Sequence, residues 1–311
     1  MRLVSDNSRD KARSPKLRVV ESAHAQVPTA LPKRMRLRDG RVILFPAIMG
    51  VLNVTPDSFS DGGRYLEPAR AIEHGLAMEA HGAGIIDIGG ESTRPVGART
   101  VAVEEEIRRV MPVVEALAAK LRVPISIDTR KSAVAARALE AGAAIINDIS
   151  AFEYDPAMAL VAARARAAVV LMHMRGGAED HLKFARYRDV AREVIEYLIA
   201  RAEAAVRTGV ARSRIILDPG IGFAKTARHN LALLDALPRL AAVGYPVMVG
   251  SSRKSFVRRI AGASERDIEF GTAAADALAV AAGASIVRVH DPGAARAVVR
   301  MAAAIRARRP R

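Results

Sequence analysis

Residues 123–148, VPISIDTRKSAVAARALEAGAAIIND, contain one complete repeat of the pattern that runs through most of the chain. Residues 123–127 form a short apolar, β-branched run, which is typical of a strand buried on both faces. Residues 132–141 have helical spacing of their apolar side chains and end at Gly142, a common stop for a helix. A second apolar run at residues 143–146 follows. This order predicts a strand–helix–strand unit of a covered parallel sheet.

The same alternation repeats along the rest of the chain. Eight apolar runs are each followed by a segment of helical character, over about 260 residues in total. The runs are residues 42–51, 84–88, 123–127, 143–146, 167–172, 214–217, 246–249 and 284–289. The number and regularity of the units predict an α/β fold of the TIM-barrel type, a (β/α)8 barrel. An open doubly wound sheet is the alternative, although it rarely needs eight evenly spaced units.

The net charge of +15 is concentrated at the two ends of the 311-residue chain. Residues 1–41 and 296–311 together hold 17 of the 48 basic residues and 4 of the 33 acidic ones, which leaves residues 42–295 with a net charge of only +2. With no Trp and 4% aromatic residues, the folded part does not suit nucleic-acid binding. We expect a basic, disordered extension at residues 1–40, a barrel domain at 41–300 and a basic tail at 301–311.

The composition also limits the compartment and the chemistry. The chain has no cysteine, which excludes disulfides, thiolate metal sites and cysteine nucleophiles. No uncharged apolar stretch approaches the roughly 20 residues that a membrane helix needs. No hydrophobic run follows the first charges, as it would in a secretory signal peptide. We therefore expect a cytoplasmic protein that has neither membranes nor nucleic acids as partners.

Polar side chains follow nearly every predicted strand at its C-terminal end, where TIM-barrel enzymes place their chemistry. In chain order they include Asn53, Asp128, Asn147, His173, Asp218, Lys254, Arg288 and His290. A single Asp at such a position often caps the next helix. Capping does not explain why acidic, amide and basic groups all gather on one rim, so the rim is the candidate site.

The rim groups suit the two halves of one ligand. Asp128, Asn147 and Asp218 would read the N–H and amino groups of a planar heterocycle, because carboxylates accept charge-assisted hydrogen bonds. Positive charge and hydrogen-bond donors for a phosphate group come from Arg288, His290, Arg94, Lys254 and Thr93. No P-loop motif and no transition-metal spacing of His and carboxylates is present. A Mg²⁺ ion held mostly by phosphate oxygens and one protein oxygen fits better.

Five motifs, in this order along the chain, resemble those of the dihydropteroate synthases, folate-pathway enzymes that sulfonamides inhibit. They are NVTPDSFSDGG (53–63), DIGGESTRP (87–95), LDPGIGFAK (217–225), SRKS (252–255) and RVHD (288–291). The resemblance spans residues 49–292. It implies a TIM-barrel transferase that joins 6-hydroxymethyl-7,8-dihydropterin diphosphate to 4-aminobenzoate, giving 7,8-dihydropteroate and diphosphate. It also implies a homodimer and a Mg²⁺ cofactor.

The resemblance assigns roles to the matched residues. Those for the pterin ring are Asp128, Asn147, Met172, Asp218 and Lys254. Those for the diphosphate are Thr93, Arg288, His290 and Asn53, the last also a Mg²⁺ ligand. Those for 4-aminobenzoate are Arg94, Pro95, Phe223, Lys254 and Ser255. Catalysis would depend on Asp128, Lys254, Arg288 and His290. Because diphosphate can leave before the amine attacks, no enzyme nucleophile is required.

The chain departs from the family pattern at two places in these loops. Val96 is inserted after Pro95, where the family usually continues with Gly-Ala, and Ala151 replaces a usual Gly. The altered loop leaves open the alternative of a non-catalytic pterin-binding paralogue. Two further alternatives are a methyltetrahydrofolate-dependent corrinoid methyltransferase of the same superfamily and a polyanion-binding protein that acts through its basic ends.

Overall fold

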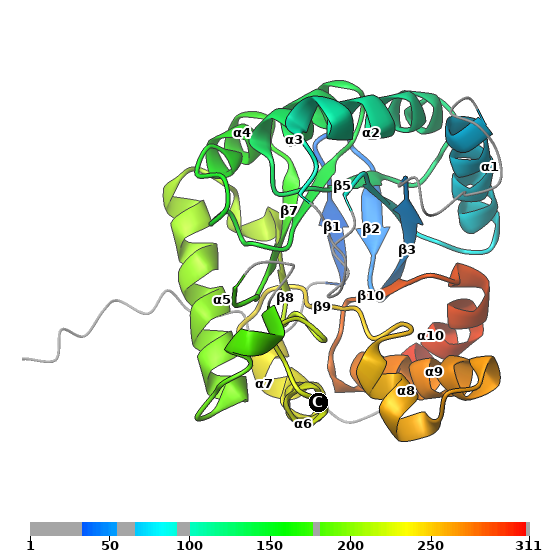
Figure 1. Cartoon of the computed structure of the whole chain (residues 1–311), viewed down its shortest axis with the longest axis vertical. Helices are drawn as coiled ribbons and strands as arrows, with labels where there is room; N and C mark the ends of the chain where they lie inside the picture. Colours follow the sequence, from blue (N-terminus) through cyan, green and yellow to red (C-terminus); the bar gives the residue numbers. More distant parts are fainter. Residues whose placement is uncertain (1–32, 55–65, 92–99, 177–180, 309–311) are drawn as a thin grey trace, which may run out of the picture.

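A computed structural model of the chain describes residues 33–54, 66–91, 100–176 and 181–308. Within them, eight parallel strands form one sheet, and helices surround it on all sides (Figure 1). The strands are ordered β8-β7-β6-β5-β4-β3-β10-β9. A parallel bridge pairs Leu217 of β8 with Val247, and the Leu217 N–H donates to the carbonyl of Pro246 at 2.9 Å. These contacts bring the two edges of the sheet together, so the expected TIM barrel is confirmed.

The barrel strands agree with the apolar runs of the sequence. They are β3 (Ala47–Asn53), β4 (Ile85–Gly89), β5 (Ile125–Asp128), β6 (Ile145–Asp148), β7 (Ala168–Met172), β8 (Ile215–Asp218), β9 (Met248–Val249) and β10 (Ile286–Val289). Only the first run differs, because residues 42–51 are divided at Phe45-Pro46 into β2 (Val42–Leu44) and β3. Proline has no N–H to donate to a strand ladder, so a break there is expected.

Helices follow the barrel strands and cover them from outside. They are α1 (Leu66–Ala80), α2 (Val103–Ala118), α3 (Ser132–Glu140), α4 (Met158–Arg164), α5 (Val190–Arg207), α6 (Ala227–Asp235), α7 (Leu237–Ala241), α8 (Ser255–Ala261), α9 (Glu265–Ala282) and α10 (Pro292–Ala307). Short side chains cap several of them: Asp189 accepts from the N–H of Arg192 at α5, and Asp291 accepts from that of Ala294 at α10. In the described part of the chain, no helix is long and apolar enough to cross a membrane.

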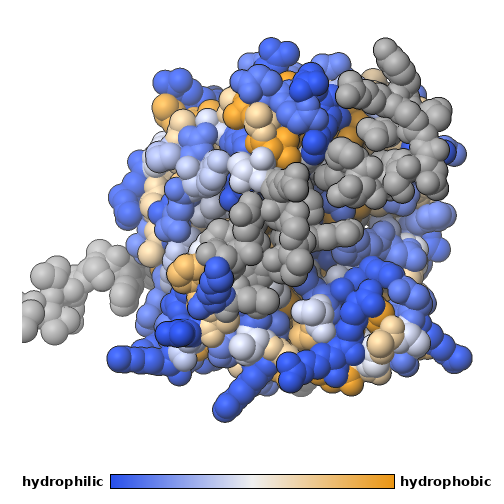
Figure 2. All heavy atoms as spheres, viewed as in Figure 1, coloured by the Kyte–Doolittle hydropathy of each residue, from blue (hydrophilic) through white to orange (hydrophobic). Residues whose placement is uncertain are grey.

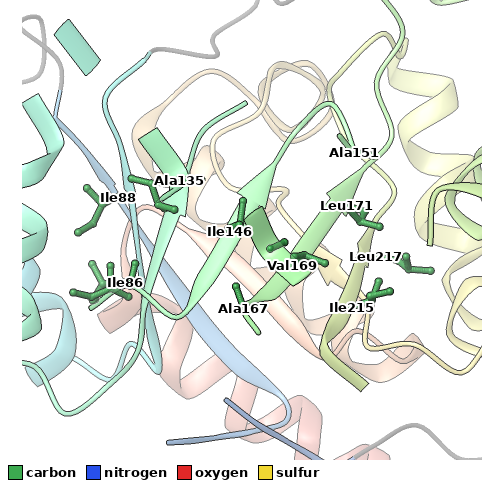
Figure 3. Packing of buried hydrophobic residues seen from close by; sticks show 14 of the residues in the cluster. Ile86, Ile88, Ala135, Ile146, Ala151, Ala167, Val169, Leu171, Ile215 and Leu217 are labelled. Carbon is green, nitrogen blue, oxygen red and sulfur yellow. The ribbon is translucent and has the colours of Figure 1, made fainter. Parts of the chain in front are cut away.

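Strand side chains are buried on both faces, which explains why the runs are apolar throughout rather than alternating. One set points outward and packs under the helices, as Ile86 and Ile88 of β4 and Val169 and Leu171 of β7 do (Figure 3). The intervening residues point inward and fill the barrel, among them Ile85, Ile145, Ala168, Val170 and Ile216. The outer surface is mostly hydrophilic, with scattered apolar side chains, on the face shown in Figure 2.

A β-hairpin closes the N-terminal end of the barrel. Strand β1 (Arg34–Arg36) pairs antiparallel with β2. The side chains of Met35, Leu37 and Ile43 are buried and belong to the same cluster as inward residues at the starts of the barrel strands, such as Ala47. The hairpin therefore plugs the barrel from below.

The structure differs from the expected boundaries at both ends of the barrel. The hairpin begins at Arg34, within the segment 1–40 that we expected to be a disordered extension. At the other end, α10 continues to Ala307 and buries Ala302, so most of the expected tail from residue 301 belongs to the last helix. Met35 and Leu37 indicate the hairpin, and Ala302 indicates the last helix. All three lie among arginines, which we interpreted as parts of basic tails.

Candidate active site

The polar residues at the C-terminal ends of the strands converge on one cleft, as the sequence predicts. Asp128, Met172 and Asp218 are the last residues of β5, β7 and β8, and Asn147 is the last but one of β6. Loops after β9 and β8 add Lys254 and Phe223, and β10 and its end add Arg288 and His290. Eight predicted site residues therefore line the cleft: Asp128, Asn147, Met172, Asp218, Phe223, Lys254, Arg288 and His290.

Two predicted residues of the described part of the chain, Asn53 and Ser255, are not among those that line this cleft. Asn53 ends β3 and pairs with Gly89, whose other neighbour in the sheet is Asp128, so Asn53 lies on the same rim beside the cleft. Ser255 is exposed at the start of α8, directly after Lys254. Thr93, Arg94 and Pro95, together with Val96, lie outside the described residues.

Arg288 reaches across the barrel to two carboxylates. Its Nε donates to Oδ2 of Asp87 and its Nη2 to Oδ2 of Asp128, both at 2.7 Å. Burial opposes the charged form of Arg288, but the two carboxylates outweigh it and raise the pKa of the guanidinium. Asp87, fully buried on β4, was not among the predicted site residues. Its place at the start of the motif at 87–95 was the available indication.

Burial controls the two acidic residues of the cleft. It raises the pKa of Asp128 against the opposing charge of Arg288, and nearby Asp87 raises it further. Burial also raises the pKa of Asp218, although the N–H of Gly220 donates to its Oδ1 at 2.7 Å and Lys254 is near. Both carboxylates are buried and have therefore lost most of their hydration. A ligand edge that carries N–H donors would replace that lost hydration.

Lys254 is held by the loop that follows β8. Its Nζ donates to the carbonyl of Ile221 at 2.8 Å and lies 4.1 Å from the centroid of the Phe223 ring. Burial lowers the pKa of Lys254 to about 8, while Asp218 opposes this shift. Gly222 has a φ of +84°, and a Cβ there would lie 2.8 Å from Cδ of Lys254. The glycine thus leaves the space through which the lysine reaches the cleft.

Lys225, which was not among the predicted site residues, holds the same loop through contacts of its side chain. Its buried Nζ contacts Nδ1 of His173 at 3.0 Å and donates to the carbonyl of Phe223 at 2.8 Å. Burial lowers the pKa of Lys225 to about 7 and that of His173 to about 2. His173 is therefore a neutral imidazole, and the contact of its Nδ1 with Lys225 gives this strand-end histidine a structural role.

The loop between β9 and α8 is held from two sides. The Ser252 hydroxyl lies 3.1 Å from Nδ1 of His290, which connects this loop to the end of β10. The Ser251 hydroxyl donates to Oδ1 of Asp276 on α9 at 2.8 Å. Burial raises the pKa of Asp276 to about 7. These contacts fix the backbone just before Lys254.

A buried ionic cluster lies at the end of β4. Glu91 pairs with Arg130 and Lys131, and Lys131 also pairs with Glu106 of α2. Oε2 of Glu91 accepts from the N–H of Val101 at 3.2 Å. Burial opposes the charged form of Glu91, but the hydrogen bond from Lys131 and the charge of Arg130 outweigh it and lower its pKa. The cluster therefore ties residue 91 to residue 101, on either side of residues 92–99.

Comparison with known proteins identifies the family of the chain. Residues 49–290 match the family described as pterin binding enzyme, so the chain belongs to the pterin-binding enzymes. A dihydropteroate synthase of Synechocystis sp. is 46% identical over 259 residues, which is 83% of this chain and 89% of that protein. The relatives named here and below are all dihydropteroate synthases, which confirms the resemblance and the expectation of a transferase.

Two solved structures show the same architecture. A dihydropteroate synthase of Xanthomonas albilineans with 4-aminobenzoic acid has a TM-score of 0.82 and 42% identity, covering 89% of this chain and 99% of that one. A Yersinia pestis dihydropteroate synthase with a sulfonamide drug has a TM-score of 0.82 and 39% identity, covering 88% of this chain and 99% of that one.

Proposed function

We propose that this protein is a dihydropteroate synthase that joins 6-hydroxymethyl-7,8-dihydropterin diphosphate to 4-aminobenzoate and releases diphosphate. The observation that carries the proposal is the division of one cleft into two kinds of wall. Asp128, Asn147 and Asp218 supply two buried carboxylates and an amide, the acidic wall, and the Arg288 guanidinium with the His290 imidazole supplies the second, cationic wall. The family to which the chain belongs and the substrate seen in the X. albilineans structure support it.

The acidic wall would bind the pterin ring. Asp128 and Asp218 would accept hydrogen bonds from ring N–H and amino groups, because both carboxylates are buried and have lost water. Met172 would contact the flat face of the ring. The Lys254 ammonium would donate to the ring carbonyl, which has the opposite polarity to the edge read by the carboxylates.

The cationic wall would bind the diphosphate. Arg288 and His290 would donate to its oxygens, together with Thr93 and Asn53. We propose that Asn53 also binds Mg²⁺, since an amide oxygen at the rim suits a hard cation that takes most of its ligands from phosphate. The described residues contain no group of three or more acids or histidines that would hold a metal by themselves. When bound, Mg²⁺ would neutralise charge on the leaving diphosphate.

The reaction needs no covalent enzyme intermediate. The bond between the pterin methylene carbon and the diphosphate oxygen breaks, and its electron pair leaves with the diphosphate. Arg288 and His290 stabilise that charge, while the Asp128 carboxylate stabilises the cation left on the pterin. The lone pair of the 4-aminobenzoate nitrogen then forms the new C–N bond, and that nitrogen loses a proton to solvent. Side chains bordering this second substrate would be Phe223, Lys254, Ser255, Arg94 and Pro95.

We also propose that the protein works in the cytoplasm as a homodimer. Large apolar side chains are exposed on the last two helices of the barrel, at Phe270 and Leu278 of α9 and at Met301 and Ile305 of α10. Such residues suit contact with a second copy of the chain. Light scattering of the purified protein would test this: a single species of monomer mass would contradict it.

The experiment that tests the function is a turnover assay with purified protein, pterin diphosphate, Mg²⁺ and 4-aminobenzoate. Diphosphate release and dihydropteroate formation should require both substrates, and Asp128→Ala and Lys254→Ala should each lower kcat/KM by at least about 100-fold. Wild-type protein that binds the pterin diphosphate without forming product would contradict the proposal. That result would instead indicate the non-catalytic paralogue.

A further inference from the structure

Asp87 connects the two walls of the cleft without lining it. The carboxylate is fully buried on β4. Its Oδ2 accepts from Nδ2 of Asn147 at 2.9 Å and from Nε of Arg288 at 2.7 Å. One oxygen atom thus holds a residue of the proposed ring site and a residue of the proposed diphosphate site.

The contact with Asp87 decides which end of the Asn147 amide faces it. A carboxylate oxygen only accepts, so the NH₂ group of Asn147 must point towards Asp87. The amide oxygen is then directed away from Asp87. Oδ1 of Asn147 is buried and has no hydrogen-bond partner among the described residues, and Asn147 lines the cleft. A buried acceptor in that condition is stabilised by a ligand that donates to it.

Arg288 is oriented by the same carboxylate. Asp87 takes the Nε–H, and Asp128 takes one N–H of Nη2. Because the guanidinium is planar and carries five N–H groups in fixed directions, holding two of them sets the directions of the others. Asp87 thus orients Arg288 from below the cleft.

We propose that Asp87 is a positioning residue that makes Asn147 an acceptor towards the ligand, so that the cleft selects a ring that carries a donor at that position. The inference rests on the proposed function, which supplies the ring. It adds a determinant of specificity that never touches the substrate. The 2-amino-4-oxo ring of a pterin carries such a donor, and the corresponding 2,4-dioxo ring replaces its amino group with a carbonyl.

The test is the ratio of the dissociation constants of 6-hydroxymethylpterin and 6-hydroxymethyllumazine, its 2,4-dioxo counterpart, measured by calorimetry. Asp87→Ala removes the acceptor that fixes the Asn147 amide, so either end of that amide can turn towards the ring. The preference for the pterin should therefore fall by about tenfold in this variant. Adding Asn147→Asp to Asp87→Ala places an oxygen towards the ring whichever way the side chain turns, and this double variant should recover much of the preference.

Asp148→Ala is the matched control, because Asp148 is also a buried carboxylate at the end of a strand. Its oxygens accept from Ser150 and from the N–H of Phe152, and it does not line the cleft. This variant should lower the thermal midpoint and leave the ligand preference unchanged. A preference that also stays unchanged in Asp87→Ala overturns the inference, while turnover by the wild type would keep the proposed function. A wild type that neither binds pterin nor forms product overturns both.

Discussion

Replacing Gly222 with Ala should remove Lys254 from its position in the cleft while leaving the fold intact. The added Cβ would lie 2.8 Å from Cδ of Lys254 and 3.3 Å from its Nζ. Both distances are below van der Waals contact, and the atoms concerned belong to the outer part of a long side chain. The lysine will therefore move, and its 2.8 Å hydrogen bond to the carbonyl of Ile221 will break.

The magnitude follows from two separate effects. An Ala at a φ of +84° costs about 1–2 kcal/mol of stability, because its Cβ crowds the backbone in the left-handed region. Loss of a charged hydrogen bond from Lys254 to the ligand is worth about 1.5–3 kcal/mol. The second effect lowers kcat/KM by about 10- to 100-fold.

Gly40 provides the matched control for this prediction. It has a φ of +87°, but a Cβ there would meet no atom within 4 Å. Gly40→Ala should lose about the same stability in urea unfolding, about 1–2 kcal/mol, with unchanged turnover. Kinetics of Gly222→Ala that match those of Gly40→Ala would refute the argument, since they would show that Lys254 either stays in place or is not needed.

Three further predictions concern charge and burial. Between about pH 4 and 7 the native state binds more protons at Asp276 than the unfolded chain does, so this residue makes stability fall as the pH rises. In urea titrations Asp276→Asn should therefore be more stable than the wild type at pH 8, by at most about 4 kcal/mol, and equal to it at pH 3. Lys131→Met should cost about 3 kcal/mol or more in denaturant unfolding, because it takes the ammonium away from buried Glu106 and leaves Glu91 paired with Arg130. Arg108→Met, at an exposed ion pair, should change stability by less than about 1 kcal/mol, and equal losses in the two variants would contradict this prediction. Met35→Ala should cost about 2–5 kcal/mol with no change in KM, and wild-type stability would show that the hairpin does not plug the barrel.

The fold was largely predictable because a covered parallel strand has apolar side chains on both faces. Each barrel strand lies within or overlaps a predicted run, and the run at residues 143–146 precedes Asn147 at the rim as expected. The hairpin was missed because Met35 and Leu37 alternate with arginines. A period of two over so few residues is weak beside a segment of high positive charge, and only the barrel interior shows what those two side chains contact.

The residues that line the cleft were predictable for a geometric reason, but the buried residues that hold them in place were not. The end of each parallel strand faces the same rim, so polar residues at those ends had to converge. Asp87 and Lys225 act behind the cleft and meet partners far away in the chain: Asp87 and Arg288 are 201 residues apart, and Lys225 and His173 are 52 apart. No local pattern indicates which buried charge supports which ligand-facing group, because that depends on packing across the barrel.

The pairing of β10 with β3 has a consequence for the protein during its synthesis. The register joins Ile286 to Ala47, so the first barrel strand has no second neighbour until β10 has been synthesised. Until then the growing sheet has an open edge at β3, which is able to pair with strands of other chains. Arg288 arrives on the same late strand. A nascent chain that lacks this strand has neither a closed barrel nor a complete cleft, so a ligand can stabilise the protein only after β10 has been synthesised.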